Sequence, residues 1–219
     1  MTPRALLFDL DGTLTDPRRG IIGSIRYALE QMECASPPDD VLATFIGPPL
    51  RGTFAGLLQS SSPELIERAV TLYRERFGAI GLYENKVYRG VPEMLAAAGA
   101  LGPAAFVATS KAAVYAERIV RHFGLGHHFA RVYGSDLAGR FEDKSELLPH
   151  LLAAERIAAG AAVMIGDRSV DVLAARAAGI PSIGVLWGYG SAAELTEAGA
   201  DALCASPGEL LACLSRLAA

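Results

Sequence analysis

The sequence predicts an α/β protein with a Rossmann-like, three-layer core and a mostly parallel sheet, into which an all-helical domain is inserted. Two observations support this prediction. Short apolar runs alternate with helical patterns from residue 83 onward, which is typical of parallel strands joined by right-handed crossovers. A further apolar run begins at Ala5, whereas residues 15–82 contain only helical patterns. We therefore assign residues 1–14 and 83–219 to the core and residues 15–82 to the insert.

The individual elements follow from local patterns. The run from Ala5 is apolar at successive positions, as expected of a strand that is covered on both faces. Asp16 followed by Pro17 indicates the start of the first insert helix, with an acidic N-cap and a proline at the first helical position. Later helices of the insert are separated by proline-containing breaks at 37–38, 47–49 and 60–63. The core then has predicted strands at 105–109, 131–134, 161–165, 180–186 and 201–204, and predicted helices at 91–100, 112–123, 146–154, 170–178, near 193, and at 207–217.

Composition excludes several classes of protein. The chain has 219 residues, of which 51% are hydrophobic and 20% charged, as in ordinary globular proteins. Its formal net charge of -4 argues against a nucleic-acid-binding surface. No stretch reaches the roughly 18 apolar residues of a membrane span, so we expect no membrane partner. The three cysteines, Cys34, Cys204 and Cys213, lack the spacing of a metal site and indicate free thiols in a reducing cytoplasm. For the oligomeric state, a monomer is the default expectation.

Two carboxylates end the first strand. Asp9 and Asp11 lie two residues apart, so on an extended chain they point to the same side, and Gly12 follows them. They repel each other unless a cation or a shared proton lies between them, and Mg2+ prefers carboxylate oxygens. An ordinary Asp-Gly turn would explain the same residues without chemistry. A calcium loop is excluded, because Leu14 and Gly20 occupy the positions where that loop needs Gly and Glu.

Further polar residues stand at the ends of later strands or the starts of helices. They are Thr109, Ser110, Lys111, Asp143, Lys144, Ser145, Asp167 and Asp171. Ligands of open parallel sheets bind beyond the carboxyl ends of the strands. We therefore expect carboxylates, a hydroxyl and a cation to meet at one edge of the sheet, a set that suits a metal-bound phosphate.

This combination resembles the haloacid dehalogenase-superfamily hydrolases, in the branch with phosphoglycolate phosphatases and 5'-nucleotidases. The resemblance rests on Asp9-x-Asp11-Gly12-Thr13, on Thr109, on Lys144, and on Gly166-Asp167 with Asp171 four residues later. It covers essentially the whole chain, including the loops at 47–50 and 187–190. It implies a hydrolase for a small phosphate ester with Mg2+ as its cofactor.

The resemblance also implies roles for single residues. Asp9 would attack phosphorus, and Asp11 would protonate the leaving oxygen and then take a proton from water. Mg2+ would be bound by Asp9, Asp167, the backbone carbonyl of Asp11 and, directly or through water, Asp171. Residues expected to hold or neutralise the phosphoryl group are Asp9, Gly12, Thr109, Ser110 and Lys144.

Simpler interpretations stay open for three of these residues. Thr109 could be an ordinary strand residue, Lys144 a solvated lysine, and Asp171 the partner of an arginine on its own helix. Two relatives within the superfamily are disfavoured: a dehalogenase needs no acid at Asp11, and a phosphonatase needs a lysine in the insert, which has none. A sugar phosphomutase shares the core acids, but mutase-like members tend to have a His where the insert begins. A non-catalytic phosphate-binding protein is the remaining alternative.

The insert is expected to act as a cap that closes over the site, excludes water and selects the leaving group. Its loop at 47–50 is held rigid by two prolines and is the expected specificity element. Arg51 follows this loop and is a candidate for binding a substrate carboxylate or a second phosphate; an ordinary surface arginine is the alternative.

Overall fold

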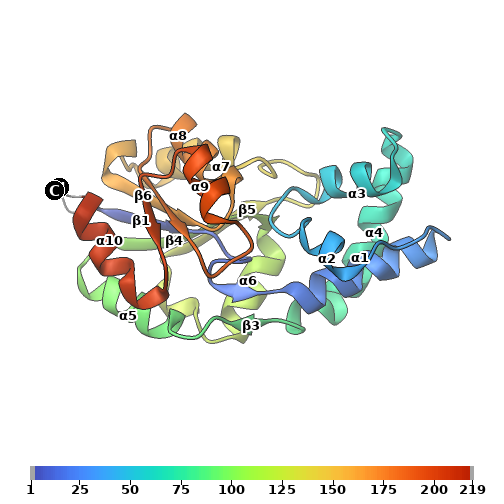
Figure 1. The fold of residues 1–219 in the computed structure, drawn as a ribbon, viewed down its shortest axis with the longest axis horizontal. Coiled ribbons are helices and arrows are strands. Elements are labelled where there is room, and N and C mark those ends of the chain that lie inside the picture. The colour runs from blue at the N-terminus through green and yellow to red at the C-terminus, as the bar shows by residue number, and fades with distance from the viewer. Residues whose placement is uncertain (1–2, 218–219) are drawn as a thin grey trace. The chain divides into compact units, whose positions relative to one another are not determined.

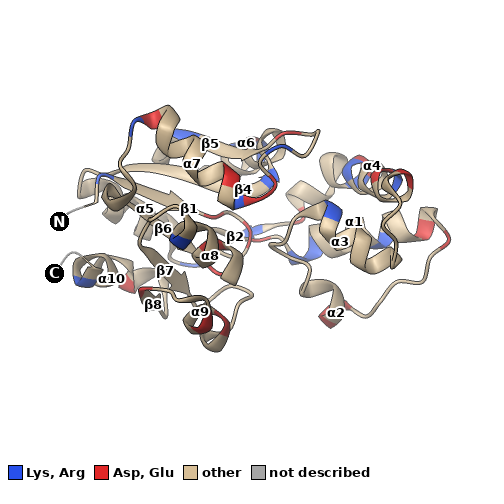
Figure 2. Cartoon of the chain, turned by 90° about the horizontal axis from the view of Figure 1, so that it is seen from above, with Lys and Arg blue, Asp and Glu red and all other residues tan. Residues whose placement is uncertain are grey.

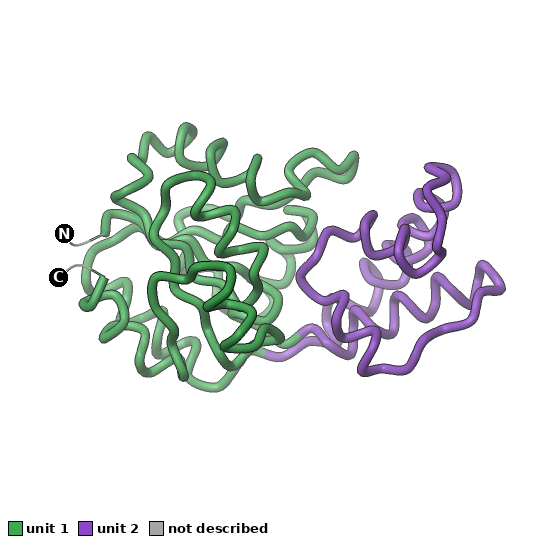
Figure 3. Tube along the Cα trace, turned by 45° about the horizontal axis from the view of Figure 1, so that its top comes forward, with its two compact units in different colours: residues 1–16, 87–219 green, residues 17–86 purple. Residues whose placement is uncertain are grey.

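The computed structural model describes residues 3–217, whose elements are shown in Figure 1. The chain forms two compact units, one from residues up to Asp16 and from Val87 onward, the other from Pro17–Lys86 (Figure 3). The second unit thus begins and ends slightly later than the insert assigned from sequence, 15–82. The chain leaves the first unit through β2 (Thr15–Asp16) and returns through β3 (Lys86–Val87), and these two strands pair. Strands of two residues are too short to give a sequence pattern.

The first unit is built on a six-stranded sheet with the order β5-β4-β1-β6-β7-β8, in which every pairing is parallel. Its strands are β1 (Ala5–Phe8), β4 (Ala104–Ala112), β5 (Arg131–Ser135), β6 (Ala162–Gly166), β7 (Ser182–Val185) and β8 (Ala202–Cys204). From β1 the chain builds outward through β4 and β5, and then continues on the other side of β1 with β6. The order therefore reverses between β1 and β6, and ligands of such sheets bind beyond the strand ends at this point.

Helices cover both faces of this sheet (Figure 1). They are α5 (Val91–Ala100), α6 (Ala113–His122), α7 (Lys144–Glu155), α8 (Ser169–Ala177), α9 (Ala192–Ala198) and α10 (Leu210–Leu217). Short 3-10 turns are η2 (Gly126–His128), η3 (Ala159–Ala161) and η4 (Pro207–Glu209). The α/β fold class predicted from sequence is confirmed. The last helix is shorter than predicted, because residues from Pro207 form η4 before α10 begins.

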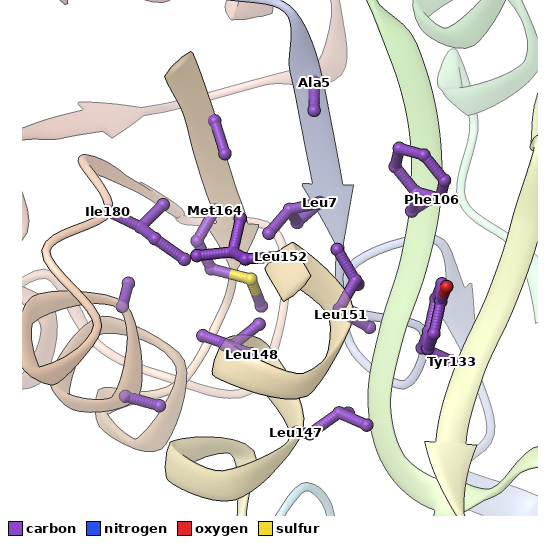
Figure 4. Packing of buried hydrophobic residues seen from close by; sticks show 14 residues of the cluster. Ala5, Leu7, Phe106, Tyr133, Leu147, Leu148, Leu151, Leu152, Met164 and Ile180 are labelled. Atoms are coloured by element: carbon purple, nitrogen blue, oxygen red, sulfur yellow. The ribbon is translucent and has the colours of Figure 1, made fainter. Parts of the chain in front are cut away.

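One hydrophobic cluster joins α7 and α8 to the sheet (Figure 4). Leu147, Leu148 and Leu151 of α7 are fully buried against Leu7 of β1 and Met164 of β6. Each buried leucine of this kind stabilises the fold by about 1.5–3 kcal/mol. Lys144 is the first residue of this helix. The packing of the leucines therefore also helps to position Lys144.

The second unit is helical in its described elements. They are α1 (Arg18–Gln31), α2 (Asp39–Ala43), α3 (Leu50–Leu58), α4 (Pro63–Ala79) and the 3-10 turn η1 (Gly81–Tyr83). The Ser62 side chain caps α4 by accepting a hydrogen bond from Leu65 N–H (3.4 Å). Phe77 stacks on Tyr73, whose ring contacts Phe54 edge-on, where α3 and α4 pack together. Acidic and basic residues are both present on α4 (Figure 2).

The start of α1 corrects one prediction. The N-cap residue is Pro17, not Asp16, and the helix begins at Arg18. The Asp16 carboxylate instead accepts a hydrogen bond from the Tyr189 hydroxyl, a partner far away in the sequence. A tertiary contact has therefore replaced the local cap. Among the described residues, no helix combines the length and the apolar character needed to cross a bilayer.

Candidate active site

Three buried carboxylates meet where the strand order reverses. Asp9 directly follows β1, and its N–H donates to the carbonyl of Ile165 on β6 (2.9 Å). Asp167 directly follows β6, and Asp171 lies in the first turn of α8. Asp9, Asp167 and Asp171 each offer one oxygen within 4.8 Å of the others, and they are 3%, 0% and 1% exposed. The pairing of β1 with β6 thus produces a compact acidic cluster from residues more than 150 positions apart.

Electrostatics make this cluster a fitting cation site. Burial, followed by repulsion from Asp9 and Asp171, raises the pKa of Asp167 to about 8. Burial also raises the pKa of Asp171 to about 6, although the charge of Lys144 opposes the shift. A divalent cation among the three carboxylates would stabilise their ionised forms, and Mg2+ prefers oxygen ligands of this type. The donor set therefore fits the Mg2+ expected from sequence.

Lys144 lies inside this cluster. Its ammonium donates to Asp9 Oδ1 (2.6 Å) and to Asp171 Oδ1, and the residue is only 4% exposed. Burial alone would lower the pKa of Lys144, but the charges of Asp171 and Asp9 outweigh it and raise that pKa, so the lysine is charged. Asp143 caps the helix by accepting from Ser145 N–H (2.8 Å), which is why α7 starts earlier than predicted. Lys144 is not a solvated lysine, and Asp171 pairs with it, not with an arginine of α8.

Gly12 gives the chain close access to Asp167. Its φ of +91° lies in the left-handed region, and a Cβ atom there would come within 2.2 Å of Asp167 Oδ2. Its N–H donates to the carbonyl of Thr15 (2.8 Å), and the expected contact of Gly12 with the phosphoryl group stays a prediction. The next residue, Thr13, donates through its hydroxyl to Asp167 Oδ1 (3.2 Å).

The loop after β7 completes the surroundings of Asp167. Tyr189 N–H donates to Asp167 Oδ2 (2.8 Å), and the Trp187 indole donates to the carbonyl of Thr13 (2.9 Å). Arg168, next to Asp167, donates to Glu194 (3.0 Å). Thr13 and the loop 187–190 contribute to the resemblance found in the sequence, but the sequence predicts no role for Thr13 or Tyr189 themselves. Their hydrogen bonds to Asp167 were missed, because they join residues that are distant in the sequence.

Asp11 is not one of the three clustered carboxylates, although the charges of Asp9 and Lys144 act on it. Its Oδ2 accepts from the ammonium of Lys111 (2.6 Å). Its Oδ1 is buried and has no hydrogen-bond partner among the described residues. Burial raises the pKa of Asp11, although the charge of Lys111 opposes that shift. The metal contact expected of Asp11 involved its backbone carbonyl and stays a prediction.

Thr109 and Ser110 lie where β4 becomes irregular. The pairing of β4 with β5 is regular up to Ala108, shifts register, and resumes at Ala112. Thr109 is 2% exposed and its hydroxyl accepts from Lys111 N–H (3.3 Å). The Ser110 carbonyl accepts from the Ser135 hydroxyl (3.0 Å). Thr109 and Ser110 therefore lie on the same irregular stretch of β4 as Lys111, and their expected contact with the phosphoryl group stays a prediction.

Arg51 belongs to the helical unit, at the start of α3. Its guanidinium forms a two-point ion pair with Glu67 of α4, through Nε and Oε1 and through Nη2 and Oε2, the latter at 3.1 Å. The arginine side chain is 23% exposed. This pair gives Arg51 a structural partner within its own unit, and its expected contact with substrate stays a prediction.

Comparison with known proteins extends the resemblance noted in the sequence. Residues 6–185 match the family described as haloacid dehalogenase-like hydrolase. A relative from Pseudomonas aeruginosa named 5'-nucleotidase is 47% identical over 190 residues, 87% of this chain and 86% of that protein. A relative from Xanthomonas campestris named phosphoglycolate phosphatase is 32% identical over 85% of both chains.

The chain is also similar to a protein named as a kinase and to a crystal structure. A protein from Mycobacterium tuberculosis named tyrosine-protein kinase PtkA is 40% identical over 87% of this chain, which spans only 65% of that protein. The crystal structure of a predicted phosphatase from Clostridium acetobutylicum has a TM-score of 0.94 at 36% identity, covering 100% of this chain and 99% of that one. By its motifs, its fold and these matches, the chain belongs to the haloacid dehalogenase-like hydrolase family.

Proposed function

We propose that this protein is a Mg2+-dependent phosphomonoester hydrolase that forms an aspartyl-phosphate on Asp9. The observation that carries the proposal is the arrangement of two kinds of buried carboxylate at one sheet edge. Asp9 lies in a cluster with Asp167, Asp171 and Lys144, while Asp11 is not part of that cluster and has one oxygen without a hydrogen-bond partner in residues 3–217. Nucleophilic attack and proton transfer need separate groups, and this arrangement supplies both.

Asp9 is the proposed nucleophile. Lys144 holds its Oδ1 at 2.6 Å and restricts the rotation of its carboxylate. The positive charge of Lys144 also favours approach of an anionic phosphoryl group, which Asp9 alone would repel. The bond from Asp9 to phosphorus would form as the bond from phosphorus to the leaving oxygen breaks.

Asp11 is the proposed acid and base. Because burial raises the pKa of this carboxyl group, a proton on it is easier to keep at neutral pH than on an ordinary aspartic acid. It would give this proton to the leaving oxygen. In the second half of the reaction it would accept a proton from the water that attacks phosphorus, which returns Asp9 and releases phosphate.

Asp9, Asp167 and Asp171 are the residues proposed to hold Mg2+. When bound, the ion would neutralise charge on the phosphoryl oxygens and on the carboxylates. Thr13 and Tyr189 N–H would keep Asp167 in place through the two hydrogen bonds that they donate to it.

The substrate is proposed to be a small phosphorylated metabolite. Nucleoside 5'-monophosphates are the first candidates, because a relative named 5'-nucleotidase shares 47% identity with this chain. Phosphoglycolate is the next candidate, because a relative named phosphoglycolate phosphatase is 32% identical to this chain. The helical unit is proposed to act as the cap that selects among them, moving about the paired strands β2 and β3.

Transfer to an acceptor other than water is the alternative outcome. The relative named tyrosine-protein kinase makes this a specific possibility, and a sugar phosphomutase would also keep both aspartates. All three reactions begin with phosphoryl transfer, but only hydrolysis releases phosphate with no acceptor present. We expect phosphate release in the absence of any acceptor.

The direct test measures hydrolysis of p-nitrophenyl phosphate with Mg2+ and with a chelator, followed by a panel of phosphate esters. We expect turnover only with Mg2+. Asp9→Asn should lower kcat by a factor on the order of 10⁴ to 10⁶, the scale of losing a covalent nucleophile. Turnover by Asp9→Asn at the wild-type rate would refute the assignment, and circular dichroism would establish that the variant is folded.

A further inference from the structure

Lys111 forms a buried ion pair with Asp11. Its ammonium lies 2.6 Å from Asp11 Oδ2, and the two side chains are 8% and 10% exposed. A lysine that is removed from water needs a paired anion, since an unpaired charge in the interior is strongly unfavourable. The charge of Asp11 therefore contributes to stabilising the Lys111 ammonium, and removal of either side chain would change the environment of the other.

Only one oxygen of Asp11 is engaged by this pair. Oδ1 is buried and has no hydrogen-bond partner among the described residues. Buried polar atoms in proteins nearly always have a partner, so the partner of Oδ1 is expected from outside the described residues, as a water molecule or a ligand. Lys111 thus fixes the carboxylate by Oδ2 and leaves Oδ1 available.

The backbone around Lys111 is held by contacts within β4 and by contacts with β5. Lys111 N–H donates to the Thr109 hydroxyl, and the Ser135 hydroxyl of β5 donates to the Ser110 carbonyl. Gly134 of β5 lies so close that a Cβ atom there would come within 2.4 Å of the Lys111 carbonyl oxygen. The irregular pairing between Ala108 and Ala112 is of the type that redirects side chains near active sites. This segment is therefore rigid enough to position a side chain.

The two lysines at this sheet edge contact different carboxylates. Lys144 contacts Asp9 and Asp171, whereas Lys111 contacts Asp11. The chain has only one other lysine, Lys86, and it is exposed. Concentrating two of three lysines at one sheet edge, each on a different carboxylate, indicates two different tasks.

We infer that Lys111 is a positioning residue for the acid-base group: it holds Asp11 by Oδ2 so that the proton is exchanged through Oδ1. This inference rests on the proposed phosphatase function. As the bond from Asp9 to phosphorus forms and the bond to the leaving oxygen breaks, the proton on Oδ1 moves to that oxygen. The carboxylate that results is then paired with the Lys111 ammonium.

A comparison of two leaving groups tests the inference. Phenyl phosphate and p-nitrophenyl phosphate have similar shapes and no second anionic group, but phenol is the weaker acid and leaves poorly without a proton. General acid catalysis contributes about 10²- to 10⁴-fold, so loss of its alignment should lower kcat/KM for phenyl phosphate by about 10- to 100-fold. For p-nitrophenyl phosphate we expect less than about a threefold loss, because its leaving group depends little on protonation.

The variants are Lys111→Met, Lys111→Arg, Asp11→Asn and the double variant Lys111→Met/Asp11→Asn. Arg121→Met, which removes an exposed cation of α6 away from the site, is the control. We expect Lys111→Arg to restore part of the phenyl phosphate activity and Arg121→Met to match the wild type. In the Asp11→Asn background, Lys111→Met should have no further effect on the ratio of the two kcat/KM values.

Equal losses for both esters in Lys111→Met would overturn the inference and indicate a purely structural or phosphate-binding lysine. A further change of the ratio in the Asp11→Asn background would also overturn it, since Lys111 would then act without Asp11. A wild-type protein that hydrolyses neither ester in Mg2+ would instead refute the proposed function itself, and the inference with it.

Discussion

At the scale of single residues, the site depends on how closely the chain can approach Asp167. Gly12 allows that approach through its left-handed backbone and its missing side chain, and Thr13 and Tyr189 N–H then bind the two carboxylate oxygens. The carboxylate is consequently fixed before any ligand arrives. Pre-organisation of this kind is what makes a cation-binding carboxylate effective, because its orientation does not have to change on binding.

Gly12→Ala should therefore lower turnover as well as stability. The new Cβ would lie 2.2 Å from Asp167 Oδ2, so Asp167 must move. Gly102→Ala is a matched control, because Gly102 has a φ of +94° and no atom within 4 Å of the added Cβ. Both should lose about 1–2 kcal/mol of stability from the left-handed backbone. Only Gly12→Ala should also lose turnover, by about 100-fold or more on the scale of a 1 Å misplacement; equal turnover in the two variants would contradict this explanation.

The residues also show where sequence reasoning succeeds. Asp9, Asp167 and Asp171 could be predicted as one group, because each follows a strand or begins a helix and parallel strands end at a common edge. The pairing of Lys111 with Asp11 could not, since it depends on an irregularity of β4 that no local pattern reveals. The sequence indicated only that Lys111 follows a strand and would lie at the same edge of the sheet.

At the scale of elements, α7 links the hydrophobic core to the chemistry. Its leucines pack against β1 and β6, while Lys144 at its first position contacts Asp9 and Asp171. The Asp143 cap sets the first residue of the helix, and the core packing sets its direction. The N-terminus of α7 is thereby aimed at the site by contacts that lie away from it.

Leu151→Ala in α7 should destabilise the core without touching a site residue. Leu151 is fully buried in the cluster of Figure 4, and removal of a buried leucine side chain costs about 2–5 kcal/mol. Leu173→Ala on α8 is the control, because Leu173 is 52% exposed and should change stability by no more than about 0.5 kcal/mol. Urea unfolding followed by circular dichroism gives both values. Similar midpoints for the two variants would show that the cluster is packed less tightly than described.

Elements differ in how well they could be predicted. The bounds of α5 agree with the predicted helix at 91–100, since its apolar spacing and flanking glycine define it locally. The start of α1 was misplaced by an assumed Asp16 cap, because Asp16 is engaged by Tyr189 instead. Elements set by their own sequence were predicted well, and element ends set by distant partners were not.

At the scale of the whole molecule, the chain consists of an α/β unit and a helical unit joined by β2 and β3. All the residues proposed for chemistry belong to the α/β unit, whereas Arg51 belongs to the helical one. Under the proposed function, chemistry and choice of substrate would belong to different units. This division would allow one set of carboxylates to serve different phosphate esters in related proteins.

Mg2+ should stabilise the whole protein by binding its folded state. A ligand present at 100 times its Kd raises the free energy of unfolding by about 2.7 kcal/mol. Because Mg2+ would also relieve the repulsion among the three buried carboxylates, we expect a measurable rise in Tm. Asp167→Asn should abolish most of this rise, whereas Asp40→Asn, an exposed acid of α2, should keep it. A rise in Asp167→Asn equal to that of the wild type would place the cation elsewhere.

The central claim is that Asp9 becomes phosphorylated, and trapping the phosphoenzyme tests it most directly. Asp11→Asn should be mixed with p-nitrophenyl phosphate and Mg2+, quenched in acid and examined by intact-mass and peptide mass spectrometry. The p-nitrophenol leaving group needs little protonation, so the variant should still form the phosphoenzyme. Hydrolysis of the phosphoenzyme lacks its base in this variant, so the intermediate should accumulate. We predict one added phosphoryl group per chain, located on Asp9 and absent from Asp9→Asn/Asp11→Asn. Release of p-nitrophenol without any phosphorylated Asp9, or with the phosphoryl group on another residue, would contradict the account.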